Sequence, residues 1–163
     1  MVSELLVSAF LLAGTPLPQT QKSQTPVTPE QGAVIANAPP IKMGLWEADI
    51  STARGTALKT RSCLTPQSYR EELAHMPPGC SLSNVQTSSS GMSGDVSCTM
   101  QDGLTSSGHI AAQFPDMGTV HVTINITMTM QGHTMPIAIT SDSHFVSADC
   151  GDIQPGRSKV IQH

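Results

Sequence analysis

The sequence predicts a mainly β protein: a curved antiparallel meander, or a partly closed barrel, with one short helix. Apolar and polar residues alternate through much of the chain, as in "TVHVTINITMTM" at 119–130, and this alternation is typical of half-buried strands. Short turn signals such as SSSG, PDMG and QGH separate these runs. Charged residues make up 12% of the chain and aromatic residues 3%. The core must therefore come from Val, Ile, Leu, Met and Ala, which suits strands better than a helical bundle.

The first 14 residues are typical of a signal peptide for export. Residues 5–13 form an apolar run that only Ser8 interrupts. This run is too short to span a bilayer but fits the central segment of a secretory leader. The residues before it include Glu4 and no Lys or Arg, unlike the usual basic start of a leader. We therefore expect an exported chain with no transmembrane span in its mature form.

Three further segments follow in the predicted domain organisation. Residues 15–41 are rich in Pro, Gln and Thr with few large apolar side chains, so we expect a disordered linker. A single β domain is predicted over 42–155. Residues 156–163 are then a short C-terminal tail.

The domain opens with "GLWEADI" at 44–50. Alternation places Trp46 on an apolar face and Glu47 and Asp49 on the opposite, wet face. We expect Trp46, the only tryptophan of the chain, to fill the core or the barrel mouth, where it is also a possible ligand contact. Gly55 then predicts a turn into a returning strand that ends at Cys63.

One helix is predicted, at about residues 66–76. Thr65 is a suitable N-cap and Pro66 suits the first helical position. Leu73 and Met76 follow Tyr69 at helical spacing, which gives one apolar face. Pro77, Pro78 and Gly79 end the helix.

The remainder is predicted as strands joined by tight turns. Strands are expected at 80–88, 91–100, 103–114 and 119–130, and the last long strand within 134–151. Pro136 cannot donate to a sheet ladder, so we expect an edge or a bulge near the start of the last strand.

The four cysteines favour two disulfides over a metal site. Their number is even, and an exported chain meets an oxidising compartment. No two of them are close enough for a C-x-x-C zinc pattern. Of the three possible connectivities we favour Cys80–Cys98, which closes a local hairpin, with Cys63–Cys150, which ties the early strands to the last one.

Patterns that indicate catalysis are absent from the sequence. It contains no G-x-S-x-G elbow, no G-x-G-x-x-G fingerprint and no Walker pattern. The net charge is −4 with no basic stripe, which argues against nucleic acid as a partner. Glu47 and Asp49 could imitate a glycosidase pair, but adjacent acids on a strand more often form its solvated side. We predict no enzyme activity, no catalytic residue and no cofactor.

A metal-handling role is the alternative hypothesis. Imidazole and thioether groups are ligands for copper or zinc, and the candidates are His109, His121, His133, His144, Met92, Met100, Met117, Met128, Met130 and Met135. Their spacing gives no HxxxH or MxxM motif. Met128 and Met130 occupy the apolar positions of an alternating strand, so we assign them to the core and predict no metal site.

Three segments in this order resemble one known family. They are GLWE at 44–47, RSCLTPQ at 61–67 and ADCGDIQP at 148–155. The chain is similar to the bacterial envelope family catalogued as domain of unknown function 3617, over roughly residues 42–155. The resemblance implies export to the periplasm or beyond, a cysteine framework and a single β domain, but no activity. With it, we expect a binding or interaction module whose partner is a small apolar ligand or an envelope protein.

Overall fold

The computed structural model describes residues 36–161 except 54, 56 and 101–102. The predicted signal peptide at 1–14 and most of the predicted linker at 15–41 lie outside the described residues. Among the described helices, none is long and apolar enough to cross a membrane.

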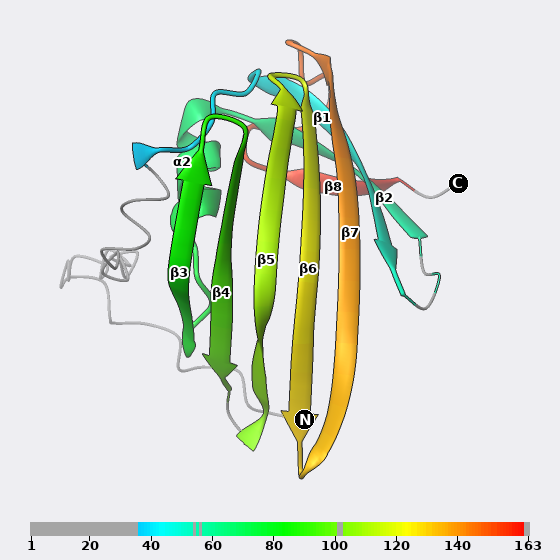
Figure 1. Cartoon of the computed structure of the whole chain (residues 1–163). Coiled ribbons are helices and arrows are strands. Elements are labelled where there is room, and N and C mark those ends of the chain that lie inside the picture. Colours follow the sequence, from blue (N-terminus) through cyan, green and yellow to red (C-terminus); the bar gives the residue numbers. More distant parts are fainter. Residues whose placement is uncertain (1–35, 54, 56, 101–102, 162–163) are drawn as a thin grey trace, which may run out of the picture.

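In the described part of the chain, eight strands form one antiparallel sheet in the order β3-β4-β5-β6-β7-β1-β2-β8 (Figure 1). Helix α2 follows β2. The bounds are β1 Gly44–Thr52, β2 Ala57–Leu64, α2 Pro66–Ala74, β3 Cys80–Ser88, β4 Gly91–Thr99, β5 Thr105–Asp116, β6 Thr119–Met130, β7 His133–Ser147 and β8 Ser158–Ile161. Strands β3 to β7 form a meander, and β1 then pairs with β7. The predicted mainly β, antiparallel fold is confirmed.

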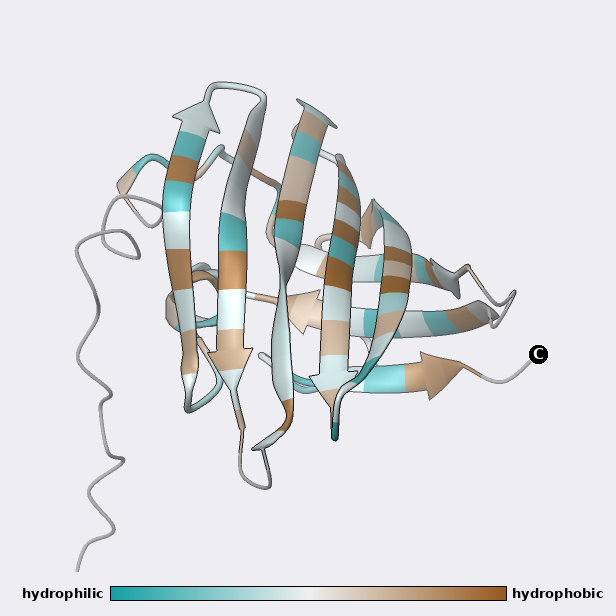
Figure 2. Cartoon of the chain, turned by 60° about the horizontal axis from the view of Figure 1, so that its bottom comes forward, coloured by the Kyte–Doolittle hydropathy of each residue, from teal (hydrophilic) through white to brown (hydrophobic). Residues whose placement is uncertain are grey.

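The sheet is strongly curved but does not close. Strands β1, β2 and β8 run across the direction of β3–β7 on the far side of the molecule (Figures 1 and 2). The edges of the sheet are β3 and β8. Helix α2 lies on the concave side, near β3 and β4 (Figure 1). The architecture is therefore a partly closed barrel with helix α2 on its inner face.

A small apolar core lies where α2 meets the concave face. Its buried members are Ile41, Trp46, Leu64 and Phe114, with Met43, Tyr69, Met92, Ala112, Val120 and Phe145 packed around them. Among the described residues, no large side chain is fully buried. The core is therefore thin for a sheet of this length, and much of the concave face stays partly exposed.

Helix α2 begins with a complete capping box. Thr65 Oγ1 accepts from the Ser68 backbone N–H at 3.1 Å, and the Thr65 N–H donates to Ser68 Oγ at 2.9 Å. Pro66 occupies the first turn as predicted. The helix ends at Ala74 rather than at 76, because Pro77 disfavours a helical backbone at the residue before it.

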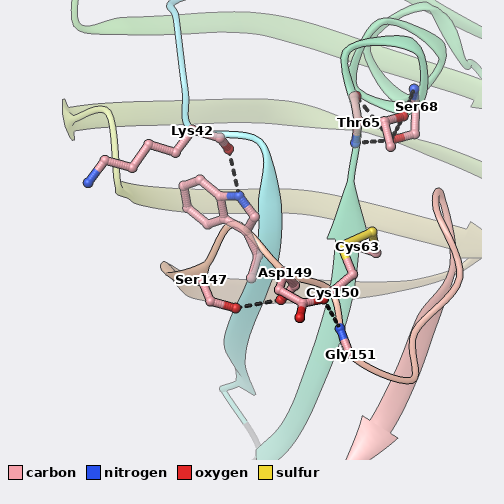
Figure 3. The surroundings of a disulfide bond; sticks show 9 residues. Lys42, Cys63, Thr65, Ser68, Ser147, Asp149, Cys150 and Gly151 are labelled. Carbon is pink, nitrogen blue, oxygen red and sulfur yellow. Dashed lines mark hydrogen bonds between the residues drawn. A yellow bond between two sulfur atoms is a disulfide. The ribbon is translucent and has the colours of Figure 1, made fainter.

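Both predicted disulfides are confirmed. Cys80 and Cys98 are direct register partners on β3 and β4. Cys63 on β2 bonds to Cys150, which follows β7. Figure 3 shows this second bridge beside Asp149, whose side chain accepts from the Gly151 N–H at 3.0 Å. The bridge therefore fixes the chain after β7 to the end of β2.

Structured residues also lie outside the predicted domain of 42–155, on both sides. The segment assigned to a tail at 156–163 contributes β8, which pairs with β2 over Lys59–Ser62. Only four residues form this strand, too few for alternation to mark it. At the other end Ile41, assigned to the linker, is buried in the core. The Pro39 carbonyl also accepts from the Tyr69 hydroxyl at 3.0 Å.

Pro136 lies where β7 has a strand on one side only. It pairs with Thr127 of β6, whereas the register of β1 with β7 ends at Ile139. Proline lacks a backbone N–H, but here no described strand pairs with β7 on the β1 side, so hydrogen bonds between β7 and two neighbouring strands are not interrupted. This agrees with the predicted edge position.

Candidate functional site

A pocket of about 250 Å³ lies between α2 and the concave face of the sheet. Strands β4 to β7 contribute Met92, Ala112, Phe114, Val120, Val122 and Ser143. The opposite wall comes from Ile41, Trp46, Ser62, Leu64, Tyr69, Glu72 and Leu73. A cavity of about 150 Å³ is enough to hold benzene, so this pocket can accept one ring or a short alkyl chain.

Trp46 forms part of the pocket wall and is held there by a hydrogen bond and a ring contact. Its Nε1 donates to the Lys42 carbonyl at 2.9 Å. Its ring meets Phe145 edge to face, with centroids 6.0 Å apart. The Lys42 Nζ in turn lies 5.1 Å from the centre of the Phe145 ring. Trp46 is only 4% exposed, so the predicted inward orientation is confirmed; contact with a ligand remains a prediction.

Two ionisable groups line the pocket from α2. Partial burial raises the pKa of the Tyr69 phenol and of the Glu72 carboxyl. The Tyr69 hydroxyl is already used, because it donates to the Pro39 carbonyl. Glu72 is also exposed to solvent, so it marks the rim of the pocket.

An apolar surface continues along the concave face beyond the pocket. Side chains two residues apart share a face of a strand, so the row that begins with Val120 and Val122 continues through Ile124, Ile126, Met128 and Met130. In Figure 2, apolar residues form bands along the long strands. Met130 is 56% exposed, so its assignment to the core is wrong. The sheet stays open there, and no described element covers the far ends of β6 and β7.

The opposite, convex face carries paired charges. Lys59 Nζ lies 3.0 Å from Glu47 Oε1 and 3.3 Å from Asp49 Oδ1, and Arg61 Nε lies 2.9 Å from Glu47 Oε2. Hydrogen bonds from Lys59 and then Arg61 lower the pKa of Glu47. A glycosidase acid needs a raised pKa. The structure thus offers no support for Glu47 as a general acid.

Two histidines of the convex face each lie beside one acid. His109 Nδ1 lies 2.8 Å from Asp95 Oδ1, and His121 Nδ1 lies 2.5 Å from Asp142 Oδ1. Within the described part of the chain, no group of three or more His, Cys, Asp or Glu could hold a metal ion. Metal handling through the methionines and histidines therefore stays a hypothesis.

The sequence placed Trp46 correctly but did not single out Glu72. The signal was present, because Glu72 follows Tyr69 by three positions and therefore shares its helix face. A carboxylate on an apolar helix face is the feature to look for. The sheet residues that lie opposite Glu72 could not be predicted, because they depend on the order of the strands.

The fold and pocket define a class: disulfide-bonded, partly open antiparallel barrels with a helix packed on an apolar concave face. The chain belongs to the family described as "Protein of unknown function (DUF3617)", which matches residues 41–150. No curated protein matches the chain. Among solved structures, a redesigned β-barrel aligns with 8% identity over 70% of this chain and 96% of its own, at a TM-score of 0.20.

Proposed function

We propose that this protein is a non-enzymatic binding module that holds a small apolar ligand in the pocket between α2 and the sheet. The observation that carries the proposal is the pocket itself. Its wall is almost entirely aliphatic and aromatic, with few polar groups, as in sites that take apolar molecules. A protein partner on the open apolar face is the other expected role, but the pocket favours a small ligand.

We further propose that the protein works in the periplasm or outside the cell. Two disulfides support this, because such bonds persist in oxidising compartments. The leader-like residues at 1–14 and the family resemblance point the same way. Expression of the full chain in a bacterial host, followed by fractionation and intact mass measurement, tests the location. We expect an N-terminally shortened, fully oxidised chain in the periplasm or medium; an unshortened cytoplasmic chain would contradict export.

Trp46 provides the test of binding, because the only tryptophan of the chain lines the pocket. We expect 1-octanol to change the emission of Trp46 in a saturable way, and native mass spectrometry to show one bound molecule. An unchanged emission together with no bound species would overturn the proposal.

Two substitutions on β5 distinguish octanol binding in the pocket from binding elsewhere on the sheet. Ala112→Phe places a ring in the pocket, whereas Ala111→Phe places the same ring on the convex face, because neighbouring residues of β5 face opposite ways. We expect Ala112→Phe to abolish octanol binding and Ala111→Phe to retain it. Urea unfolding checks that both variants fold, and Val122→Phe replaces Ala112→Phe if that variant does not. Retained binding in a folded pocket-filled variant would contradict the proposed site.

A further inference from the structure

Glu72 gives the pocket a distinctive charge. Among the described residues that line it, Glu72 is the only acidic or basic side chain. No Lys, Arg or His contributes to the wall. A ligand with an anionic headgroup would therefore meet a carboxylate and no cation.

The Glu72 carboxylate also has no hydrogen-bond or ion-pair partner among the described residues. Within the described part of the chain no side chain or backbone group donates a hydrogen bond to it, and burial alone accounts for the direction of its pKa. Other glutamates differ: Glu47 is paired with Lys59 and Arg61, and Glu71 accepts from Gln67 Nε2 at 2.9 Å. No described group therefore competes with a ligand for the acceptor oxygens of Glu72.

The indole and phenol donors of the wall are already used. Trp46 Nε1 donates to the Lys42 carbonyl, and the Tyr69 hydroxyl donates to the Pro39 carbonyl. They are not available to an anionic headgroup. In contrast, aromatic rings attract cations to their faces, and Trp46, Tyr69 and Phe114 all line the pocket. The net charge of −4 adds a long-range attraction for cations.

We infer that the pocket selects apolar molecules that carry a protonated amine, with the chain or ring among the apolar side chains and the ammonium group on Glu72 at the rim. This inference rests on the proposed function, because it requires that the pocket takes a ligand. It names the class of ligand: aliphatic or aromatic amines rather than fatty acids or other anionic amphiphiles.

Three probes of equal chain length test the selectivity: octylamine, 1-octanol and octanoate, titrated calorimetrically at neutral pH. The proteins compared are the full chain, Glu72→Gln and the matched control Glu71→Gln, which removes the neighbouring carboxylate outside the pocket. A charge-assisted hydrogen bond is worth about a tenfold change in affinity. We expect the amine to bind the unmodified protein about tenfold more tightly than octanol, and octanoate to bind most weakly.

The variants then assign the preference to one residue. Glu72→Gln should bring the three probes to within about twofold of one another while keeping octanol binding, and Glu71→Gln should preserve the preference. Equal binding of amine and octanoate by the unmodified protein would overturn the inference and leave the proposed function standing. So would an equal effect of the two substitutions. Failure of all three probes to bind would overturn both.

Discussion

Gly44 approaches the chain at Ser147 so closely that no side chain fits between them. A Cβ at position 44 would overlap the Ser147 carbonyl oxygen and lie 2.8 Å from the Ala148 Cα. Gly44 also has a φ of 133°, a conformation that L side chains rarely adopt. Next to this contact the register of β1 with β7 shifts between Leu45 and Trp46. The glycine of GLWE thus lets β1 enter the sheet beside the Cys63–Cys150 bridge.

Gly44→Ala should therefore be strongly destabilising. Backbone strain alone costs about 1–3 kcal/mol, and the overlap with Ser147 and Ala148 adds to it. Gly132→Ala is the control, because Gly132 has a φ of 80° but nothing within 4 Å of its Cβ position. Urea unfolding of both variants measures the difference. Equal losses for the two would show that close packing at Gly44 contributes nothing.

The strands and the disulfide pairing could be predicted from the sequence. Alternation located every long strand, because each has one face toward the core and one toward water. Cysteine spacing favoured the pairing that the structure shows. The pocket could not be predicted from the sequence. Trp46 and Val122 are brought together only because β1 pairs with β7 and β7 pairs with β6. Strand β8 and the exposure of Met130 depend on how far the sheet closes, which no local pattern encodes.

The two disulfides should differ in their contribution to stability. They span sequence separations of 87 for Cys63–Cys150 and 18 for Cys80–Cys98. A bridge stabilises mainly by restricting the unfolded chain, and on the loop-entropy relation these loops correspond to about 4.6 and about 3.2 kcal/mol.

Double Cys→Ser variants of each bridge, unfolded in urea without reductant, give the comparison. The variant without Cys63–Cys150 should lose more stability than the one without Cys80–Cys98. The reverse order would mean that contacts in the folded state, rather than loop length, decide the contribution. Free thiols in the unmodified protein would contradict the bridges themselves.

The capping box of α2 should matter for the pocket as well as for the helix. Thr65→Ala removes the side-chain acceptor for the Ser68 N–H and should cost about 1 kcal/mol. Because Tyr69, Glu72 and Leu73 line the pocket from this helix, octanol binding should weaken in parallel. Thr65→Ser keeps the hydroxyl and serves as the control. Unchanged stability in Thr65→Ala, measured by urea unfolding, would contradict a role for the cap.

Glu72 should make folding less favourable as pH rises. Burial raises its pKa in the folded state above the unfolded value. Between these two pKa values the folded chain binds more protons, so the free energy of unfolding falls as pH increases through that window. Glu72→Gln removes this loss. The variant should therefore be more stable than the unmodified protein at neutral pH, and the difference should vanish below about pH 4, where the unfolded carboxyl is also protonated.

Glu47→Gln is the control with the opposite sign. Hydrogen bonds from Lys59 and Arg61 lower the pKa of Glu47, so its contribution to stability is present above the unfolded pKa and is lost as pH falls through the folded one. Glu47→Gln should thus be less stable than the unmodified protein at neutral pH, with the difference disappearing in acid. Urea unfolding of all three proteins from pH 3 to pH 8 gives both profiles. If Glu72→Gln followed the profile expected for Glu47→Gln, the Glu72 carboxylate would be paired in solution, and its availability for a ligand's ammonium group would be disproved.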